Sequence, residues 1–583
     1  MNRLVSLLLC TLSLTCLALP ARADTIWVGN TSSDTACDAS NLANAMLIAA
    51  FNGTPSDTIR ISNEGGGTSG SYLDTNAVLE GNDILVQGGY ADCSGTPGSN
   101  AVLDGTGSPA APVVKITCSS SGCATRHTFT LRKLVLKNGE AGGVDVSGNV
   151  HVNMDGVTLI QNSNTNGGAL HVDATQNAVV NLYGLSTLRN SSASASGGGI
   201  YCSGFPSGGS AFQVFMTDAL IYQNDAVDGG GVYLTNGCRM RDQATSTLDG
   251  LNVNTASGNG GGVAVMGGAH FELTGSGAAP AVILSNQAAQ GGGVYVEGSG
   301  SVFAAIESHV DSNTSSGSGG GLFVTDQGLA TVIRGAALGT CKRTACVSIS
   351  NNTAVGGNGG GAGYVRSLGT IRIRGAYIRF NQARYGSAFD VSSYGGGANY
   401  GNLELSSAVV ANNYGSLGTI DAYQSPVSID GTTFYANSGP TSGPSAGVYS
   451  GTLRVNGYGS VSASVRVSRS IFDDSAGPWA SAGTGSTVDA QCIVALNASG
   501  SVTLPSDSLL QDPLLRNPAS SDFMPADRSP ALDLCNSNSV LSNSDDINRY
   551  PRGNDVQRIV NMQGPYDAGA IESDLIFFDD YEN

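Results

Sequence analysis

The sequence predicts an all-β protein: a single-stranded right-handed parallel β-helix with a short N-terminal helix cap and an irregular C-terminal cap. Its 583 residues include 82 glycines, 40% are hydrophobic and only 12% are charged, so the glycines serve turns of a folded chain. A recurring unit places an apolar residue three positions before an asparagine, and a glycine pair follows a few residues later. Alternating apolar residues come after the glycines, which is strand patterning.

Residues 1–23 are expected to be a signal peptide. Arg3 supplies the positive charge, residues 4–19 the apolar region, and residues 21–23 the small-residue cleavage site. A lipoprotein anchored on Cys16 fits less well, because Thr15 precedes it and the apolar run continues. No later run approaches the roughly 20 apolar residues of a membrane span. We therefore expect a mature chain without a transmembrane segment, secreted or displayed at the cell surface.

The net charge limits the classes of partner that this protein is expected to bind. The net charge is −18, and the four lysines are Lys115, Lys133, Lys137 and Lys342. An acidic surface repels phosphate backbones, so no nucleic-acid partner is expected. No cofactor motif is present, and no Lys-Ser or Lys-Thr follows any glycine pair as a phosphate loop requires.

The cysteines suggest disulfides. Two of the 12 cysteines, Cys10 and Cys16, lie in the signal peptide, and an even number in an oxidising compartment favours pairing. Sequence alone leaves the connectivity open. The local candidates are Cys37 with Cys93, Cys118 with Cys123, Cys202 with Cys238, Cys341 with Cys346, and Cys492 with Cys535.

The repeat divides the chain into three parts after the signal peptide. Residues 24–100 are expected to form the N-terminal cap and first coils, 101–503 the repeats, and 504–583 the C-terminal cap and tail. Within the first part, residues 40–51 suit a short helix with Ser40 as N-cap, followed by a strand at 58–61. A unit of about 25 to 30 residues cannot bury its own apolar face, so the units must stack.

Stacking places equivalent asparagines in one column. We expect their amides to hydrogen-bond from coil to coil at a bend, a structural role rather than a ligand-binding one. The predicted ladder comprises Asn162, Asn190, Asn224, Asn254, Asn286 and Asn313.

A second column points outward. Alignment on the glycines places there Asp145, His171, Tyr201, Tyr233, Ala264, Tyr295 and Phe323. Stacked rings can simply stabilise the sheet by cross-strand contact. The sharper hypothesis makes Tyr201, Tyr233, Tyr295 and Phe323 a platform for the apolar faces of sugar rings.

One basic cluster stands out on this acidic chain. Arg372 and Arg374 share a strand face, and Arg379 and Arg384 follow within about a coil. We predict a subsite for a carboxylated sugar there; the alternative is a set of solvated strand edges that discourage aggregation.

Catalytic and metal-ligating patterns are weak, and no catalytic or metal residue is predicted. Asp473 and Asp474 form the only Asp pair of the repeats, and adjacent strand residues face opposite ways, so a turn is the expected setting. Asp545 and Asp546 belong to the cap. The five histidines show no metal-binding spacing and are expected to be solvated surface residues.

The repeat resembles that of the polymorphic outer membrane proteins across roughly residues 135–440. The resemblance is carried by segments such as Phe434-Tyr435-Ala436-Asn437 and Gly167-Gly168-Ala169-Leu170. It implies a right-handed β-helix at or beyond the cell surface of a Gram-negative bacterium, often adhesive and without a defined activity.

Both ends resemble choice-of-anchor Q β-helix proteins. The matching segments are Cys37, the Ala-rich helix and residues 57–60 at the start, and residues 512–513, 529–533, 545–549 and 567–572 near the end. Residues 575–582 resemble short C-terminal tails of secreted gammaproteobacterial proteins, though Asp580 and Tyr581 replace the usual Gly and Phe. A sorting signal and an apolar closure of the last coil are both compatible with them.

We expect an adhesin-like protein that binds glycans or surfaces without catalysis, with polysaccharide or a host or neighbouring-cell surface as partner. The alternative is a polysaccharide lyase or glycoside hydrolase, since parallel β-helices host both. A surface spacer without binding is the third possibility.

Overall fold

The computed structural model describes most of the chain after residue 23. The described residues are 24–29, 34–54, 56–63, 71–72, 77–79, 82–108, 110–118, 124–206, 212–247, 249–276, 278–335, 347–356, 359–393, 399–439, 449–457, 461–536, 541, 545–553 and 562–572. The predicted signal peptide, the Cys341–Cys346 pair and the tail at 575–582 lie outside them.

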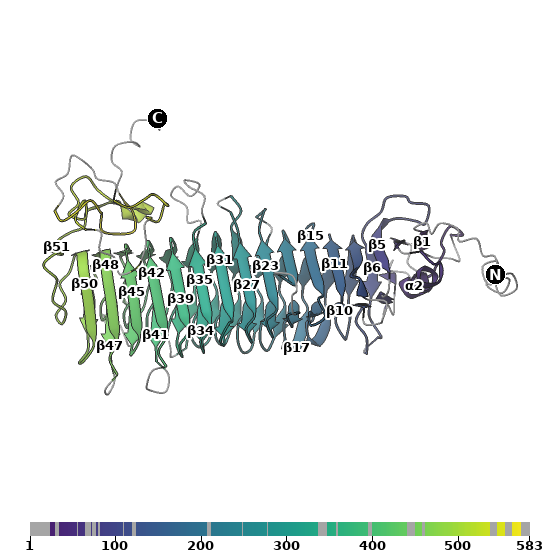
Figure 1. Cartoon of the computed structure of the whole chain (residues 1–583), viewed down its shortest axis with the longest axis horizontal. Helices are drawn as coiled ribbons and strands as arrows, with labels where there is room; N and C mark the ends of the chain where they lie inside the picture. Colours follow the sequence, from purple (N-terminus) through teal and green to yellow (C-terminus); the bar gives the residue numbers. More distant parts are fainter. Residues whose placement is uncertain are drawn as a thin grey trace, which may run out of the picture.

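Parallel strands stack along one axis into a long rod (Figure 1). A middle coil such as residues 150–173 contributes four strands in order, and each pairs in parallel with its equivalent in the next coil. The predicted all-β parallel β-helix is therefore confirmed. The right-handed sense stays a prediction from the general rule for parallel crossovers.

Two strand columns belong to one 30-stranded sheet, because β48 and β50 are long enough to join them. The first column contains β1 (Asp24–Val28), β2 (Ser56–Ser62), β5 (Asp83–Tyr90), β8 (His127–Arg132), β11 (Val150–Asp155), β15 (Val179–Tyr183), β19 (Val214–Thr217), β23 (Arg239–Gln243), β27 (His270–Thr274), β31 (Val302–Ile306), β35 (Leu329–Ile333), β39 (Thr370–Arg374), β42 (Asn402–Ser406), β45 (Pro426–Asp430), β48 (Ser464–Asp473) and β50 (Thr487–Ala495).

The second column contains β3 (Ser71–Tyr72), β6 (Ala101–Asp104), β9 (Leu134–Lys137), β12 (Thr158–Ile160), β16 (Thr187–Arg189), β20 (Leu220–Tyr222), β24 (Gly250–Asn252), β28 (Ala281–Leu284), β32 (Ser308–Asp311), β36 (Ser348–Ser350), β40 (Tyr377–Arg379), β43 (Val409–Ala411), β46 (Thr433–Tyr435) and β51 (Leu509–Leu510).

The 14-stranded sheet lies on another side of the rod. It contains β4 (Ala77–Leu79), β7 (Val114–Cys118), β10 (Val144–Gly148), β14 (Leu170–Asp173), β18 (Ile200–Ser203), β22 (Val232–Thr235), β26 (Val263–Met266), β30 (Val294–Glu297), β34 (Leu322–Thr325), β38 (Gly363–Val365), β41 (Phe389–Ser392), β44 (Ile420–Tyr423), β47 (Leu453–Asn456) and β49 (Ala480–Ala482).

A 7-stranded sheet of short strands connects the other two. It contains β13 (Ser163–Asn166), β17 (Ser192–Ser196), β21 (Asp225–Ala226), β25 (Thr255–Ala256), β29 (Gln287–Ala288), β33 (Thr314–Ser315) and β37 (Thr353–Ala354).

One continuous apolar core fills the coils from Ile26 to Ala495. Inward residues stack in register, as Val152, Val180 and Val214 do. The glycine pairs turn the chain between the 7-stranded and 14-stranded sheets. At Gly229, φ is 63° and a Cβ would lie 2.4 Å from the Val232 carbonyl oxygen, so a side chain is excluded there.

The N-terminal end is covered by α2 (Leu42–Phe51), which packs against β1, β2 and β4. The predicted cap residue was wrong by one position. The N-cap is Asn41, whose Oδ1 accepts from the Asn44 amide at 2.8 Å, while Ser40 lies before the cap and its Oγ accepts from the Asn44 side chain. Asn is as good a cap as Ser, so the geometry of the entering chain decides between them.

The C-terminal segment divides between the end and the flank of the rod. Val502 and Leu504 pack on the last coil beside Trp479. Further on, a small antiparallel pair of β52 (Leu515–Asn517) and β53 (Asp522–Pro525) encloses the 3₁₀ turn η2 (Pro518–Ser520). Figure 1 shows this part above the last coils of the rod. Its apolar residues pack on the outer side of the second strand column, in a cluster of Phe523, Ile547, Ala570 and Ile571 with Tyr377, Val409 and Ala411.

Three predicted disulfides are confirmed: Cys37–Cys93, Cys202–Cys238 and Cys492–Cys535. Cys118 is also disulfide-bonded, and its predicted partner Cys123 lies outside the described residues.

Candidate functional site

The asparagine ladder is buried and structural. Asn254 shows its pattern: the backbone N–H and Nδ2 both donate to Asn286 Oδ1, at 2.8 and 3.0 Å, and Nδ2 also donates to the Ile221 carbonyl at 3.0 Å. The bonding pattern continues in every coil as far as Asn437. The members beyond those predicted are Asn352, Asn381, Asn413 and Asn437, all unexposed.

The prediction for Asn190 was wrong. Asn190 is exposed, and the ladder position belongs to Ser191, whose Oγ accepts from the Asn162 N–H at 3.3 Å. Asn190 instead occupies the left-handed position before the ladder residue, with φ 50°. Asparagine tolerates that conformation better than most residues, so two neighbouring positions of the bend can both accept it.

The outward column of the 14-stranded sheet has the predicted register. Neighbouring coils pair His171 with Tyr201, Tyr201 with Tyr233, Ala264 with Tyr295 and Tyr295 with Phe323. We call the outward-facing residues of this sheet that share this register, from Asp145 to Arg454, the outer column. Its rings stack: the centroids of His171 and Tyr201 are 5.3 Å apart and those of Tyr201 and Tyr233 5.6 Å, with planes within 6°.

The two halves of the outer column differ in exposure. His171, Tyr201 and Tyr233 are half-buried and reach the surface, and His171 Nδ1 lies 2.8 Å from Asp145 Oδ1. Tyr295 is only 6% exposed and Phe323 only 1%, in a cluster with Tyr364 and Met266. The Arg366 guanidinium lies 5.2 Å from the centre of the Phe323 ring. The first half therefore offers ring edges to a ligand, whereas the second half is packed.

The outer column continues beyond Phe323 into residues that sequence reasoning missed. Tyr364, Asp390, Asp421 and Arg454 follow in register, and Arg454 Nη1 donates to Asp421 Oδ2 at 2.7 Å. Burial raises the pKa of Asp390 to about 6 and, helped by the Asp390 charge, that of Asp421 to about 8. Extending the glycine alignment past Phe323 would have found Tyr364 and Asp390, which lie four residues after Gly360 and Gly386 as Phe323 does after Gly319. Asp421 and Arg454 lie only three residues after a glycine, so the same alignment would have missed them by one position.

The two arginines predicted as a carboxylate subsite are already paired. Arg372 Nε donates to Glu404 Oε2 at 2.8 Å, and Arg374 Nη2 donates to Asp545 Oδ2 at 3.1 Å. Arg372 keeps half of its side chain exposed, while Arg374 holds the C-terminal segment to the rod. Arg379 also contacts that segment, through Ser521 Oγ at 2.8 Å. An anionic sugar would have to compete with carboxylates at both predicted positions.

A pocket of about 370 Å³ lies where the C-terminal segment meets the rod. Asp473 lines one wall and Asp512 the other, and Tyr435, Leu514 and Pro518 are among its remaining residues. Burial and the Asp512 charge raise the pKa of Asp473 to about 6. Asp474 faces the ladder instead. The pair was expected in a turn, but Asp473 is the last residue of β48 and Asp474 follows it directly, before the turn begins.

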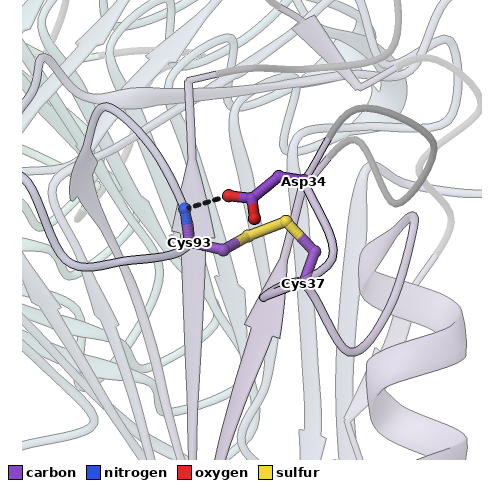
Figure 2. A group of neighbouring side chains, drawn as sticks. All are labelled: Asp34, Cys37 and Cys93. Carbon is purple, nitrogen blue, oxygen red and sulfur yellow. Dashed lines mark hydrogen bonds between the residues drawn. A yellow bond between two sulfur atoms is a disulfide. The ribbon is translucent and has the colours of Figure 1, made fainter.

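A carboxylate and two sulfurs meet near the N-terminal cap. Figure 2 shows Asp34 beside the Cys37–Cys93 disulfide, with its Oδ2 accepting from the Cys93 amide at 3.2 Å. A cysteine binds a metal through its thiolate, and these two sulfurs are instead bonded to each other. Asp34 therefore secures the loop that carries the disulfide.

Comparison with models of protein families, with curated proteins and with solved structures finds no match to this chain. Within the part of the chain that the structure describes, no helix has the length and apolar character needed to cross a membrane.

Proposed function

We propose that this protein is an exported, surface-displayed β-helix that binds polysaccharide along the exposed half of its outer column. The observation that carries the proposal is the continuous stack of His171, Tyr201 and Tyr233, which are half-buried and lie in three successive coils. A linear polymer lying along the rod would meet a ring edge and a polar tip in each of three successive coils. Aromatic residues with a polar tip are well suited to such surfaces, since they offer apolar contact and hydrogen bonds together.

The setting in the cell rests on the sequence. The signal-peptide pattern, the disulfides and the resemblance to polymorphic outer membrane protein repeats and choice-of-anchor Q proteins support export in a Gram-negative bacterium. The paired state of Arg372 and Arg374 favours neutral over acidic polysaccharides as ligands.

Retention on immobilised polysaccharides tests the proposal. The mature protein should be retained on at least one insoluble neutral glycan, and the Tyr201→Ala/Tyr233→Ala variant should elute freely. Tyr183→Ala, a half-buried tyrosine on the 30-stranded sheet, is the matched control and should be retained. Unchanged retention of the double variant, with an unchanged circular dichroism spectrum, would exclude the outer column as the polysaccharide-binding surface.

A second candidate function, cleavage of a polysaccharide, is favoured by the pocket between Asp473 and Asp512. A carboxyl whose pKa is raised, Asp473, beside a second carboxyl suits general acid–base catalysis. An enzyme should release reducing-end or unsaturated sugars from a broad panel, and Asp473→Asn should abolish that release. If no substrate yields product, cleavage is excluded, and the retention experiment distinguishes a glycan-binding protein from a spacer that binds nothing.

A further inference from the structure

One inward column of the core contains a single charged residue. Asp242 of β23 stands in register between Met216 and Leu273, and the column continues with Ala305 and Val332. Asp242 is 0% exposed. An aliphatic side chain at this position would continue the packing of its neighbours, so the carboxyl is not explained by the architecture of the coil.

A second carboxyl meets it in the interior. Asp249, which is 2% exposed, contacts Asp242, and none of the four carboxyl oxygens accepts a hydrogen bond of ordinary geometry from a described residue. The backbone N–H groups of Ala219 and Gly250 lie near Asp249, but neither makes a hydrogen bond of ordinary geometry with it. Such a pair leaves buried acceptors open, which is rare in a folded protein.

A third carboxyl lies toward the surface. The charge of Asp218 acts on both buried partners, and its own oxygens accept from Thr245 N and Ser246 N at 2.8 and 2.7 Å. Burial raises the pKa of both carboxyls, that of Asp249 to about 6. The charged groups that act most strongly on the pair are therefore all acidic, and no described cation neutralises it.

Two carboxylates cannot both stay ionised in an apolar interior without a positive charge beside them. A divalent cation would supply that charge, and carboxylate oxygens are its preferred ligands. Ca²⁺ suits an enclosed site better than Mg²⁺, because Mg²⁺ gives up its waters reluctantly. We propose that Asp242 and Asp249 bind a Ca²⁺ ion inside the rod.

Calcium binding by the full mature chain tests this. Protein stripped with chelator and dialysed against CaCl₂ should retain one Ca²⁺ per chain by elemental analysis. Its Tm should rise with the logarithm of free Ca²⁺, because the ion binds the folded state. MgCl₂ at the same concentrations should have a much smaller effect.

Variants locate the ion. Asp242→Asn/Asp249→Asn should bind no Ca²⁺ and lose the Tm shift. Asp242→Leu, which restores the apolar column, should fold without Ca²⁺ and likewise fail to bind it. Asp390→Asn, at another buried aspartate of raised pKa, is the matched control and should keep both the ion and the shift.

Three results would overturn the proposal. No retained Ca²⁺ in the parent protein would mean that the two carboxyls share a proton instead. Retention by the Asp242 and Asp249 variants, or loss in Asp390→Asn, would place the ion elsewhere. The site lies away from Tyr201 and Tyr233, so glycan retention can fail or succeed independently.

Discussion

Asp474 receives the last hydrogen bonds of the asparagine ladder from Asn437. The Asn437 N–H and Nδ2 donate to Asp474 Oδ1 at 2.7 and 3.1 Å, repeating the pattern between successive asparagines, and Thr452 Oγ1 donates to the second oxygen at 2.5 Å. The bonds onto the next ladder oxygen all run in one direction, so the ladder ends on a group that only needs to accept from it. Burial raises the pKa of Asp474 to about 7, although these donors oppose the shift.

The ladder should be a main source of stability. Asn286→Ala removes the Oδ1 that accepts from two donors of Asn254, and the Nδ2 that donates to Asn313 Oδ1 and to the Leu251 carbonyl. Leaving buried polar groups unsatisfied costs about 1 to 3 kcal/mol each, so a loss of roughly 3 kcal/mol or more is expected. Denaturant unfolding measures it.

Asn190→Gly is the control for that measurement. Asn190 lies outside the ladder with φ 50°, a conformation that glycine adopts freely, so its replacement should change stability by less than about 1 kcal/mol. A comparable loss in both variants would mean that the ladder bonds contribute little.

The rod should become less stable as pH rises from 5 to 9. Asp421, Asp474 and Glu572 have pKa values raised to about 8, 7 and 7, so the folded state holds these protons more tightly than the unfolded chain. Their contribution is complete below pH about 4 and is lost as pH rises through the folded values. Asp474→Asn has an uncharged side chain at every pH. It should therefore reduce the loss of unfolding free energy between pH 5 and 9 by a few kcal/mol at most. Tm against pH would show this, and a Tm that climbs toward pH 9 would refute it.

The C-terminal segment should detach when its buried ion pair is broken. Arg552 and Glu572 lie 3.5 Å apart with unexposed side chains, and Arg552 Nη2 also donates to the Gly431 carbonyl of the rod at 3.2 Å. Arg552→Met leaves Glu572 buried and uncompensated, which costs about 3 to 5 kcal/mol. Limited proteolysis should then cut between residues 512 and 572, while Arg528→Ala, an exposed arginine, should resist like the parent.

The Cys202–Cys238 disulfide should resist reduction in the folded state and stabilise it. Both cysteines are 0% exposed, and the bond links β18 to the segment before β23. Replacing both by Ala should cost about 2 to 4 kcal/mol. Thiol labelling after treatment with reductant should find these sulfurs only once denaturant is added; labelling under native conditions would contradict their burial.

Sequence periodicity predicted the architecture because a β-helix repeats one local solution many times. The register of Tyr201, Tyr233 and Tyr295 followed from the glycines alone. Their exposure did not, because it depends on what neighbouring side chains such as Met266 and Arg366 cover. The one-residue error at Asn190 arose where two adjacent positions accept the same residue type.

The pocket and the carboxyl pairs lay beyond sequence reasoning for a different reason. Asp473 and Asp512 meet only because the C-terminal segment folds back on the flank of the rod, a contact without periodicity. Arg374 and Asp545 meet in the same way, across 171 residues. Asp242, by contrast, left a visible signal as one carboxyl in an apolar column.

Ser191 interrupts the asparagine ladder, and this should lower the resistance of the rod to a pulling force at that point. The coils on either side of it lack an amide-to-amide bond, and the Cys202–Cys238 bridge fastens only the junction toward Asn224. The junction between Asn162 and Ser191 has no such bridge. Pulled lengthwise, the rod should open more readily at that junction, where the chain crosses at residues 174–178, than at any junction between Asn224 and Asn437.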